Sequence, residues 1–192
     1  MLRRLYQWTM SLAQSRYALV LLAVISFFEA SVFPIPPDAL MIPMILAAPR
    51  KAFLIAGVTT ISSVLGGLLG YGAGVYLFEE VGRPVLEFYG KTDAFATFTY
   101  YYNELGAAIL LLSGITPFPF KVTTILSGAT GLDLGLFIVF TLIGRGIRFF
   151  VVATLLWRYG PDIRHFIEKR LGMVFAIGLL ALLGGFFVLW MI

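Results

Sequence analysis

The stretch Pro-Ile-Pro-Pro-Asp at residues 34–38 decides the fold, because it breaks an apolar run that would otherwise form one helix. Proline lacks an amide donor and its ring clashes with the preceding turn, so a helix ends before it. Residues 117–121 repeat the form as Pro-Phe-Pro-Phe-Lys, which aligns Asp38 with Lys121. The expected helix breaks are Pro34, Pro36, Pro37, Pro117 and Pro119.

Short apolar legs flank the first break. Residues 17–33 lead into it and residues 39–48 lead out of it, and two basic residues follow at 50–51. A bilayer core of about 30 Å needs roughly 20 helical residues, so the second leg cannot cross it. Basic residues favour the cytoplasmic side, and residues 1–16 are also basic. We therefore expect a cytoplasmic N-terminus and a re-entrant hairpin at residues 17–48.

The same order of elements recurs in the second half. Residues 52–78 form an apolar stretch that is long enough to span the bilayer with tilt. Residues 105–131 carry two legs around the second break, and we expect them to form a second re-entrant hairpin that enters from outside. Residues 134–157 should span back, residues 158–170 should form a basic cytoplasmic loop, and residues 171–192 should form a last transmembrane helix.

The segment between the two halves, residues 79–104, is the most polar part of the chain. Its acidic residues outnumber its basic ones, which predicts an external segment, and its many aromatic side chains favour the membrane interface. In the preceding span, glycines at intervals of four residues predict a smooth stripe for close helix contact. They are Gly66, Gly70 and Gly74.

Together these elements predict an all-α integral membrane protein. We expect an inverted repeat of re-entrant helical hairpin plus transmembrane helix, with an additional C-terminal transmembrane helix. Inverted repeats with broken helices are typical of transporters, although two unrelated proline kinks that align by chance are the simpler alternative. The composition agrees with a membrane protein, since 60% of the 192 residues are hydrophobic and only 12% are charged.

The sequence also excludes several classes of function. There are no cysteines, so disulfides and thiolate metal sites are excluded. The net charge of +4 is split among loops and spans instead of forming a basic stripe, so we expect no nucleic-acid binding. No nucleophile motif, phosphate-binding loop or metal-ligand spacing occurs, so we expect no enzyme activity, no cofactor and no metal.

Five ionisable residues lie in or beside the apolar segments: Glu29, Asp38, Lys121, Arg145 and Arg148. Each costs at least about 2.5 kcal/mol if it is left bare at the bilayer centre. The acids come from the first half and the bases from the second, so a site at the repeat interface would bring them together. Glu29 would then be either a proton-accepting group or a structural ion-pair partner of one arginine.

The other four charges have their own alternatives. Asp38 follows two prolines at a helix start, where a simple N-cap is expected to be at least part of its role. Lys121 is a poor N-cap in the mirror position, so we expect it to bind phosphate or to neutralise an acid. Arg145 and Arg148 share one helix face near mid-span, which favours an anion or headgroup site in a cavity over snorkelling to the interface.

Four groups of residues carry a family resemblance. They are Glu29 with Phe33-Pro34-Ile35-Pro36-Pro37-Asp38, Gly66 with Gly70-Tyr71 and Gly74, Pro117 through Lys121 with Gly128, and Gly144-Arg145-Gly146-Ile147-Arg148. In this order and spacing they resemble the motifs of the DedA superfamily, also called the VTT or SNARE-associated Golgi protein superfamily, and most closely its short YqaA-like branch. They cover roughly residues 25–150, which is most of the chain.

The resemblance implies a protein of the bacterial cytoplasmic (inner) membrane that moves a phospholipid or an isoprenoid phosphate between leaflets, with the proton-motive force as one driving option. Glu29 and Asp38 would be transport or proton-coupling acids, and the bases would attract a phosphate headgroup or form ion pairs. Many bacterial members carry glutamate at the position of Asp38 and arginine at that of Lys121, which leaves the particular lipid open. Membrane lipids, protons and further copies of the chain are the partners to consider.

Two other functions stay open at this point. One is a proton-coupled transporter of small ions or solutes on the same scaffold, which would need Glu29 but would not move lipid. The other is a non-transporting structural membrane protein that organises partners through its glycine stripe.

Overall fold

The computed structural model describes residues 15, 17–31, 36–116 and 119–169, with side chains as far as residue 161. The elements in this part of the chain are helical, and no β-strand occurs within it. The helices are α2 (Ala18–Glu29), α3 (Asp38–Ala47), α4 (Ala52–Leu77), α5 (Arg83–Phe88), α6 (Thr92–Glu104), α7 (Gly106–Ile115), α8 (Phe120–Ala129) and α9 (Leu134–Lys169). A 3-10 turn at Pro49–Lys51 precedes α4, and a π-helical turn at Phe78–Gly82 follows it.

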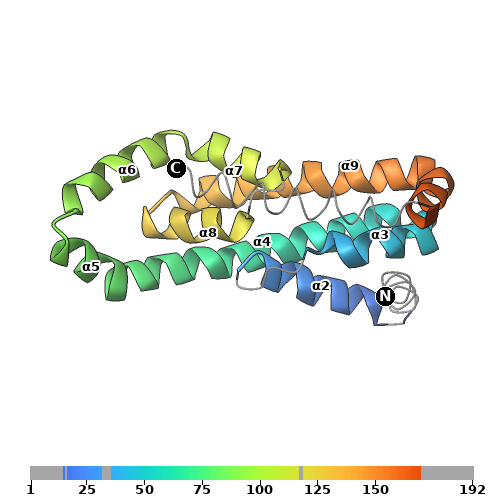
Figure 1. Cartoon of the computed structure of the whole chain (residues 1–192), viewed down its shortest axis with the longest axis horizontal. Helices are drawn as coiled ribbons and strands as arrows, with labels where there is room; N and C mark the ends of the chain where they lie inside the picture. The colour runs from blue at the N-terminus through green and yellow to red at the C-terminus, as the bar shows by residue number, and fades with distance from the viewer. Residues whose placement is uncertain (1–14, 16, 32–35, 117–118, 170–192) are drawn as a thin grey trace.

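The two long helices, α4 and α9, run side by side along the molecule (Figure 1). Two stretches, Pro49–Phe88 and Leu134–Pro161, are long and apolar enough to cross a membrane. Both helices expose large apolar side chains that a soluble protein would bury, which suits contact with lipid. These side chains include Leu54, Ile61, Leu65, Leu69, Ile143, Phe150, Val151 and Trp157.

The short helices form two pairs at different places along α4 and α9 (Figure 1). In the first pair, α2 packs on α4 and α3 packs on α9, around a core that contains Leu22 and Met41. In the second pair, α7 packs on α9 and α8 packs on α4, near a core that contains Leu110 and Phe137. These helices have 10 to 12 residues, about half the length that a membrane span needs, so each pair has its break near the middle of the long helices.

The glycine stripe on α4 lies where the short helices approach it most closely. A Cβ at Gly66 would overlap a backbone carbonyl of α2, and a Cβ at Gly74 would overlap a backbone carbonyl of α8. Gly70, between them, lies directly against the side chain of Thr124 in α8. The missing side chains therefore allow both pairs of short helices to contact one face of α4.

Residues 79–104 form the end of the π-helical turn, α5 and α6, which make an arc beyond the end of α4 (Figure 1). Two side chains tie α6 to α8: the Tyr102 hydroxyl donates to the carbonyl of Thr123 at 3.1 Å, and the Asn103 amide donates to the carbonyl of Thr130 at 2.9 Å. Burial raises the pKa of the Tyr102 phenol, so this hydroxyl stays protonated at neutral pH.

The loop predicted for residues 158–170 is instead helical over most of its length, because α9 continues through it. Only Tyr159 departs from helical geometry within α9, with φ −118°, and Pro161 follows this kink. Proline is tolerated in the first turn of a helix, where its missing N–H would have no partner. The predicted span at 171–192 and nearly all of the N-terminal segment 1–16 lie outside the described residues.

Candidate functional site

Arg145 of α9 lies buried between the two breaks. Only 1% of its side chain is exposed, and its Nη2 donates to the carboxylate of Glu29, the last residue of α2. Its guanidinium also lies over the ring of Phe120, 4.2 Å from the centroid, at the start of α8. One cation therefore joins the end of α2 to the beginning of α8.

Arg148, one turn further along α9, makes the complementary contacts. Its Nη2 donates to the carboxylate of Asp38 at 2.6 Å, and its Nη1 donates to the carbonyl of Thr116 at 3.1 Å. Asp38 begins α3, and Thr116 follows the last residue of α7. Both side chains of this ion pair are 21% exposed, so it is less shielded than the contact of Arg145.

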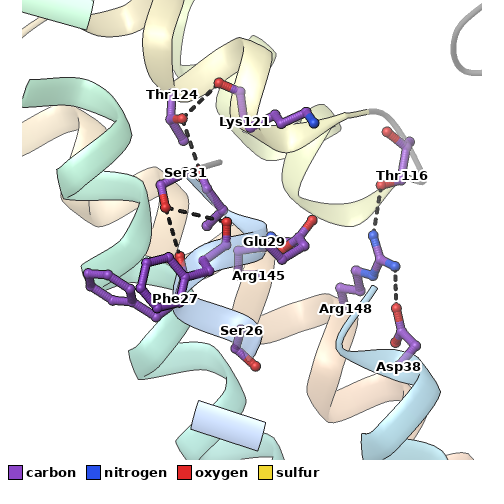
Figure 2. A network of polar contacts seen from close by, with 12 residues as sticks. Ser26, Phe27, Glu29, Ser31, Asp38, Thr116, Lys121, Thr124, Arg145 and Arg148 are labelled. Atoms are coloured by element: carbon purple, nitrogen blue, oxygen red, sulfur yellow. Dashed lines mark hydrogen bonds and ion pairs between the residues drawn. The ribbon is translucent and has the colours of Figure 1, made fainter. Parts of the chain in front are cut away.

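The two arginines hold both breaks together in a crossed pattern (Figure 2). The ends of α2 and α8 meet at Arg145, whereas the ends of α3 and α7 meet at Arg148. The breaks also touch directly, because the hydroxyl of Thr124 in α8 donates to the carbonyl of Ala30 just beyond α2, at 3.1 Å. The acids of the first half and the arginines of the second are thus brought to one place near the middle of the long helices.

Lys121, the fifth predicted charge, stands outside these pairs. It is half-buried in the first turn of α8, and within the described residues no ion pair involves it. No side chain caps the start of α8, so its first amide groups have no capping partner. A cation beside the positive end of a helix makes this place attractive to an anion.

The N-cap role expected for Asp38 is wrong. Pro37 occupies the N-cap position, and no side chain bonds the first amides of α3, because the Asp38 carboxylate points to Arg148. The acid still lies in the first turn, where its charge interacts favourably with the helix dipole. Snorkelling does not describe Arg145 either, since protein groups enclose its guanidinium.

The prolines that were predicted to break the helices lie at the starts of the second legs. Pro37 and Pro119 hold the N-cap positions of α3 and α8, and the carbonyl of Pro36 accepts a hydrogen bond from the amide of Ala39 at 3.1 Å. Proline suits the start of a helix because its fixed φ is helical and its missing N–H would be unbonded there. Pro34 and Pro117 lie outside the described residues.

A cavity of about 770 Å³ lies elsewhere, between the end of α4, the helices α5 and α6, and the chain after α8. Its charged lining residues are Glu79, Arg83 and Glu87, and the first two form an ion pair at 2.7 Å. None of the five predicted charges lines this cavity. This cavity is therefore not the one expected beside Arg145 and Arg148, which stays a prediction.

Three neutral residues of the site were missed by the sequence analysis: Thr116, Phe120 and Thr124. Thr116 directly precedes a proline that ends the helix, and the last carbonyls of a helix have no intrahelical partner, which was the available signal. Phe120 stands inside the second proline motif, but nothing in the sequence says that its ring faces a cation. Thr124 shares a helix face with Phe120 and Lys121, which is a weak signal because threonine is common in helices that pack closely.

Comparison with known proteins gives matches over most of the chain. The model of the VTT domain family matches residues 33–158. An uncharacterized protein of Haemophilus influenzae is 33% identical over 151 residues, which cover 79% of this chain and 78% of that protein. An uncharacterized protein of Histophilus somni is 33% identical over 168 residues, which cover 85% of this chain and 87% of that protein. No solved structure matches the chain significantly.

Proposed function

Because the chain belongs to the VTT domain family, whose members are membrane-associated and transporter-like, we propose that it moves a phospholipid or an isoprenoid phosphate between the leaflets of a membrane. Two stretches that are long and apolar enough to span a bilayer support the membrane setting. The apolar side chains exposed along both long helices support it as well.

The observation that carries the lipid proposal is the position of Lys121. It is a half-buried cation at the uncapped start of α8, next to the two ion pairs but not part of them. The five predicted charges comprise three bases and two acids, so one positive charge remains after both pairs form. Lysine and the free amides of a helix start are suitable ligands for a headgroup phosphate.

We propose that α2–α3 and α7–α8 are re-entrant hairpins, related as an inverted repeat in a bacterial inner membrane. The packing supports this arrangement, because the first leg of each pair lies on the long helix that follows it, and the second leg lies on the other long helix. With a cytoplasmic N-terminus, the first hairpin enters the membrane from the cytoplasm and the second enters from outside. Their breaks are then accessible from opposite sides of the membrane.

Glu29 is the proposed coupling acid. While it is ionised, it holds Arg145 and keeps the ends of α2 and α8 together. Protonation would weaken this pair and release the guanidinium toward a phosphate held by Lys121. The contacts of Arg148 with Asp38 and Thr116 join the other two helix ends in the same way. Each arginine can therefore leave its partner and bind the anion, first one arginine and then the other.

Liposomes that contain the pure protein test the proposal. Labelled anionic phospholipid and labelled isoprenoid phosphate, in separate arms, should exchange between leaflets faster than in empty liposomes. Lys121→Gln should slow the exchange by roughly tenfold, because it removes one charge-assisted bond to the phosphate. The matched control is Lys91→Gln, which changes an exposed lysine before α6 and should leave the rate unchanged.

Two outcomes would contradict lipid movement. If neither lipid exchanges faster than in empty liposomes, the proposal fails for both substrate classes. If a pH gradient drives solute or ion flux that needs Glu29 while lipids stay in place, the protein is a solute transporter on the same scaffold.

Four of the five predicted charges form two ion pairs with one another. This observation favours a second candidate function, a non-transporting structural membrane protein. Glu29 with Arg145 and Asp38 with Arg148 satisfy one another, as charges that only hold helix ends together would do. In that case Glu29→Gln should lower stability, and no arm of the liposome experiment should register transport.

A further inference from the structure

Three polar atoms of α4 and α9 are buried without a hydrogen-bond partner among the described residues: Ser63 Oγ, Thr141 Oγ1 and Arg145 Nε. The three residues are 0%, 0% and 1% exposed. Burying a polar group without a hydrogen-bond partner is costly, because the group loses its bonds to water. Three such atoms in a pair of membrane-crossing helices, where lipid offers no alternative partner, require a physical explanation.

The contacts between α4 and α9 fix the register of the two helices. A Cβ at Gly146 would lie 3.9 Å from the side chain of Thr60, and a Cβ at Gly67 would lie 3.5 Å from the ring of Phe137. The later residue of α4 thus meets the earlier residue of α9, so the helices run antiparallel. The stretch between these two contacts is the centre of the helix pair.

The register of the two helices places the residues that carry the three unpartnered atoms at this centre. Ser63 precedes Gly67 by one helical turn, and the register places Thr141 opposite it. Arg145 follows Thr141 by one turn on the same face, and its guanidinium lies over Phe120. The Phe120 ring is in turn 3.6 Å from the Cβ position of Gly67, which brings the guanidinium to the level of both hydroxyls.

Three other buried hydroxyls are satisfied by their own helices. Thr59 and Thr60 each donate to a carbonyl one turn back at 2.8 Å, and Ser26 does the same at 2.7 Å. This back-bonding is the common solution for serine and threonine in helices. Ser63 and Thr141 lack it, so their hydroxyls are free to bond a group between the helices.

We propose that Ser63, Thr141 and Arg145 bind one buried water molecule between α4 and α9. The Nε–H of Arg145 donates to the water oxygen, and the water donates its two hydrogens to the two hydroxyl oxygens. Three partners are usual for a buried water, and this arrangement gives each of the three atoms one hydrogen-bond partner. Ser63 and Thr141 are then positioning residues that fix the plane of the guanidinium between Glu29 and Phe120, whatever the protein transports.

Solid-state NMR of the protein in bilayers tests the water directly. The Nε–H of Arg145 should receive magnetisation from water, although its residue is only 1% exposed. The Ser63→Ala/Thr141→Val double variant should lose most of this transfer, because the water loses two of its three partners. Absence of transfer in the wild-type protein would overturn the proposal, and so would transfer that the double variant leaves unchanged.

A double-mutant cycle gives a second readout. If one water joins both hydroxyls, the effects of Ser63→Ala and Thr141→Val on the unfolding equilibrium constant should be coupled by roughly threefold or more. Ser26→Ala is the matched control, since its hydroxyl bonds its own helix, and its cycle with Thr141→Val should show no coupling. If the effects of Ser63→Ala and Thr141→Val are also additive, as in the control cycle, the proposal of a shared water is wrong. These measurements need no transport, so they stay informative if no lipid moves.

Discussion

At the scale of single residues, the two arginines of α9 differ in how completely the protein encloses them. Arg145 is 1% exposed, whereas Arg148 is 21% exposed. Removing one partner of a buried ion pair costs about 3–5 kcal/mol, because it leaves an uncompensated charge, and the cost falls toward 1 kcal/mol for exposed pairs. Glu29→Gln should therefore lower the free energy of unfolding by about 3 kcal/mol, and Asp38→Asn by about half as much.

Unfolding by increasing mole fractions of SDS in mixed micelles measures both losses. The double variant Glu29→Gln/Arg145→Met is the control, because it removes the pair without leaving a lone charge and should recover part of the stability. Equal losses at Glu29 and Asp38 would contradict the ranking by burial.

The sequence identifies the charged residues of the site but not their pairing. A charge in an apolar segment is costly, so Glu29, Arg145 and Arg148 can be selected from the sequence alone. Which acid meets which arginine depends on how two breaks more than 80 residues apart come together. The role of Phe120 cannot be predicted from the sequence for the same reason. It follows from the tertiary structure, in which its ring centroid lies 4.2 Å from the guanidinium of Arg145.

At the scale of elements, the glycine stripe of α4 allows a matched test. Alanine at Gly66, Gly70 or Gly74 would place a Cβ against backbone or side-chain atoms of α2 and α8, so each substitution should destabilise the protein by about 1–3 kcal/mol through overpacking. Gly72 lies on the same helix with no atom within 4 Å of its Cβ position. Gly72→Ala should be neutral or should stabilise by up to about 1 kcal/mol.

The same SDS titration measures these four variants. A loss of stability at Gly72 as large as at Gly66 would show that helix flexibility matters and that close contact does not. Unchanged stability in all four would show that α2 and α8 do not pack as closely on α4 as the structure has them.

The long helices could be read from the sequence more fully than the polar segments. Residues 52–78 were predicted as a span and form α4, because a long apolar run with basic residues before it has one simple solution in a bilayer. The segments 79–104 and 158–170 are polar, and a polar run does not reveal whether it is helical. Contacts such as those of Tyr102 with α8 hold α6 in place, and they depend on the tertiary fold.

At the scale of the whole molecule, both pairs of short helices depend on the same two arginines. Each arginine of α9 contacts one helix end from each pair, so the two halves cannot separate without breaking both sets of contacts. The two apolar cores lie on either side of this junction and share no residue. A movement that opens one side would therefore leave the core of the other side packed, which is what alternating access between two hairpins requires.

The orientation of the two hairpins predicts which ends of the chain lie on the same side of the membrane. A re-entrant first hairpin puts Ser15 and Lys51 on one side, and a re-entrant second hairpin puts Thr92 and Leu134 together on the other. The chain has no cysteine, so a single cysteine can be introduced at each of these exposed positions without removing another. In intact cells, a thiol reagent that does not cross membranes should label Thr92→Cys and Leu134→Cys, and it should label Ser15→Cys and Lys51→Cys only after the membrane is permeabilised. If Ser15 and Lys51 label from opposite sides, α2 and α3 cross the membrane together and the first hairpin is not re-entrant.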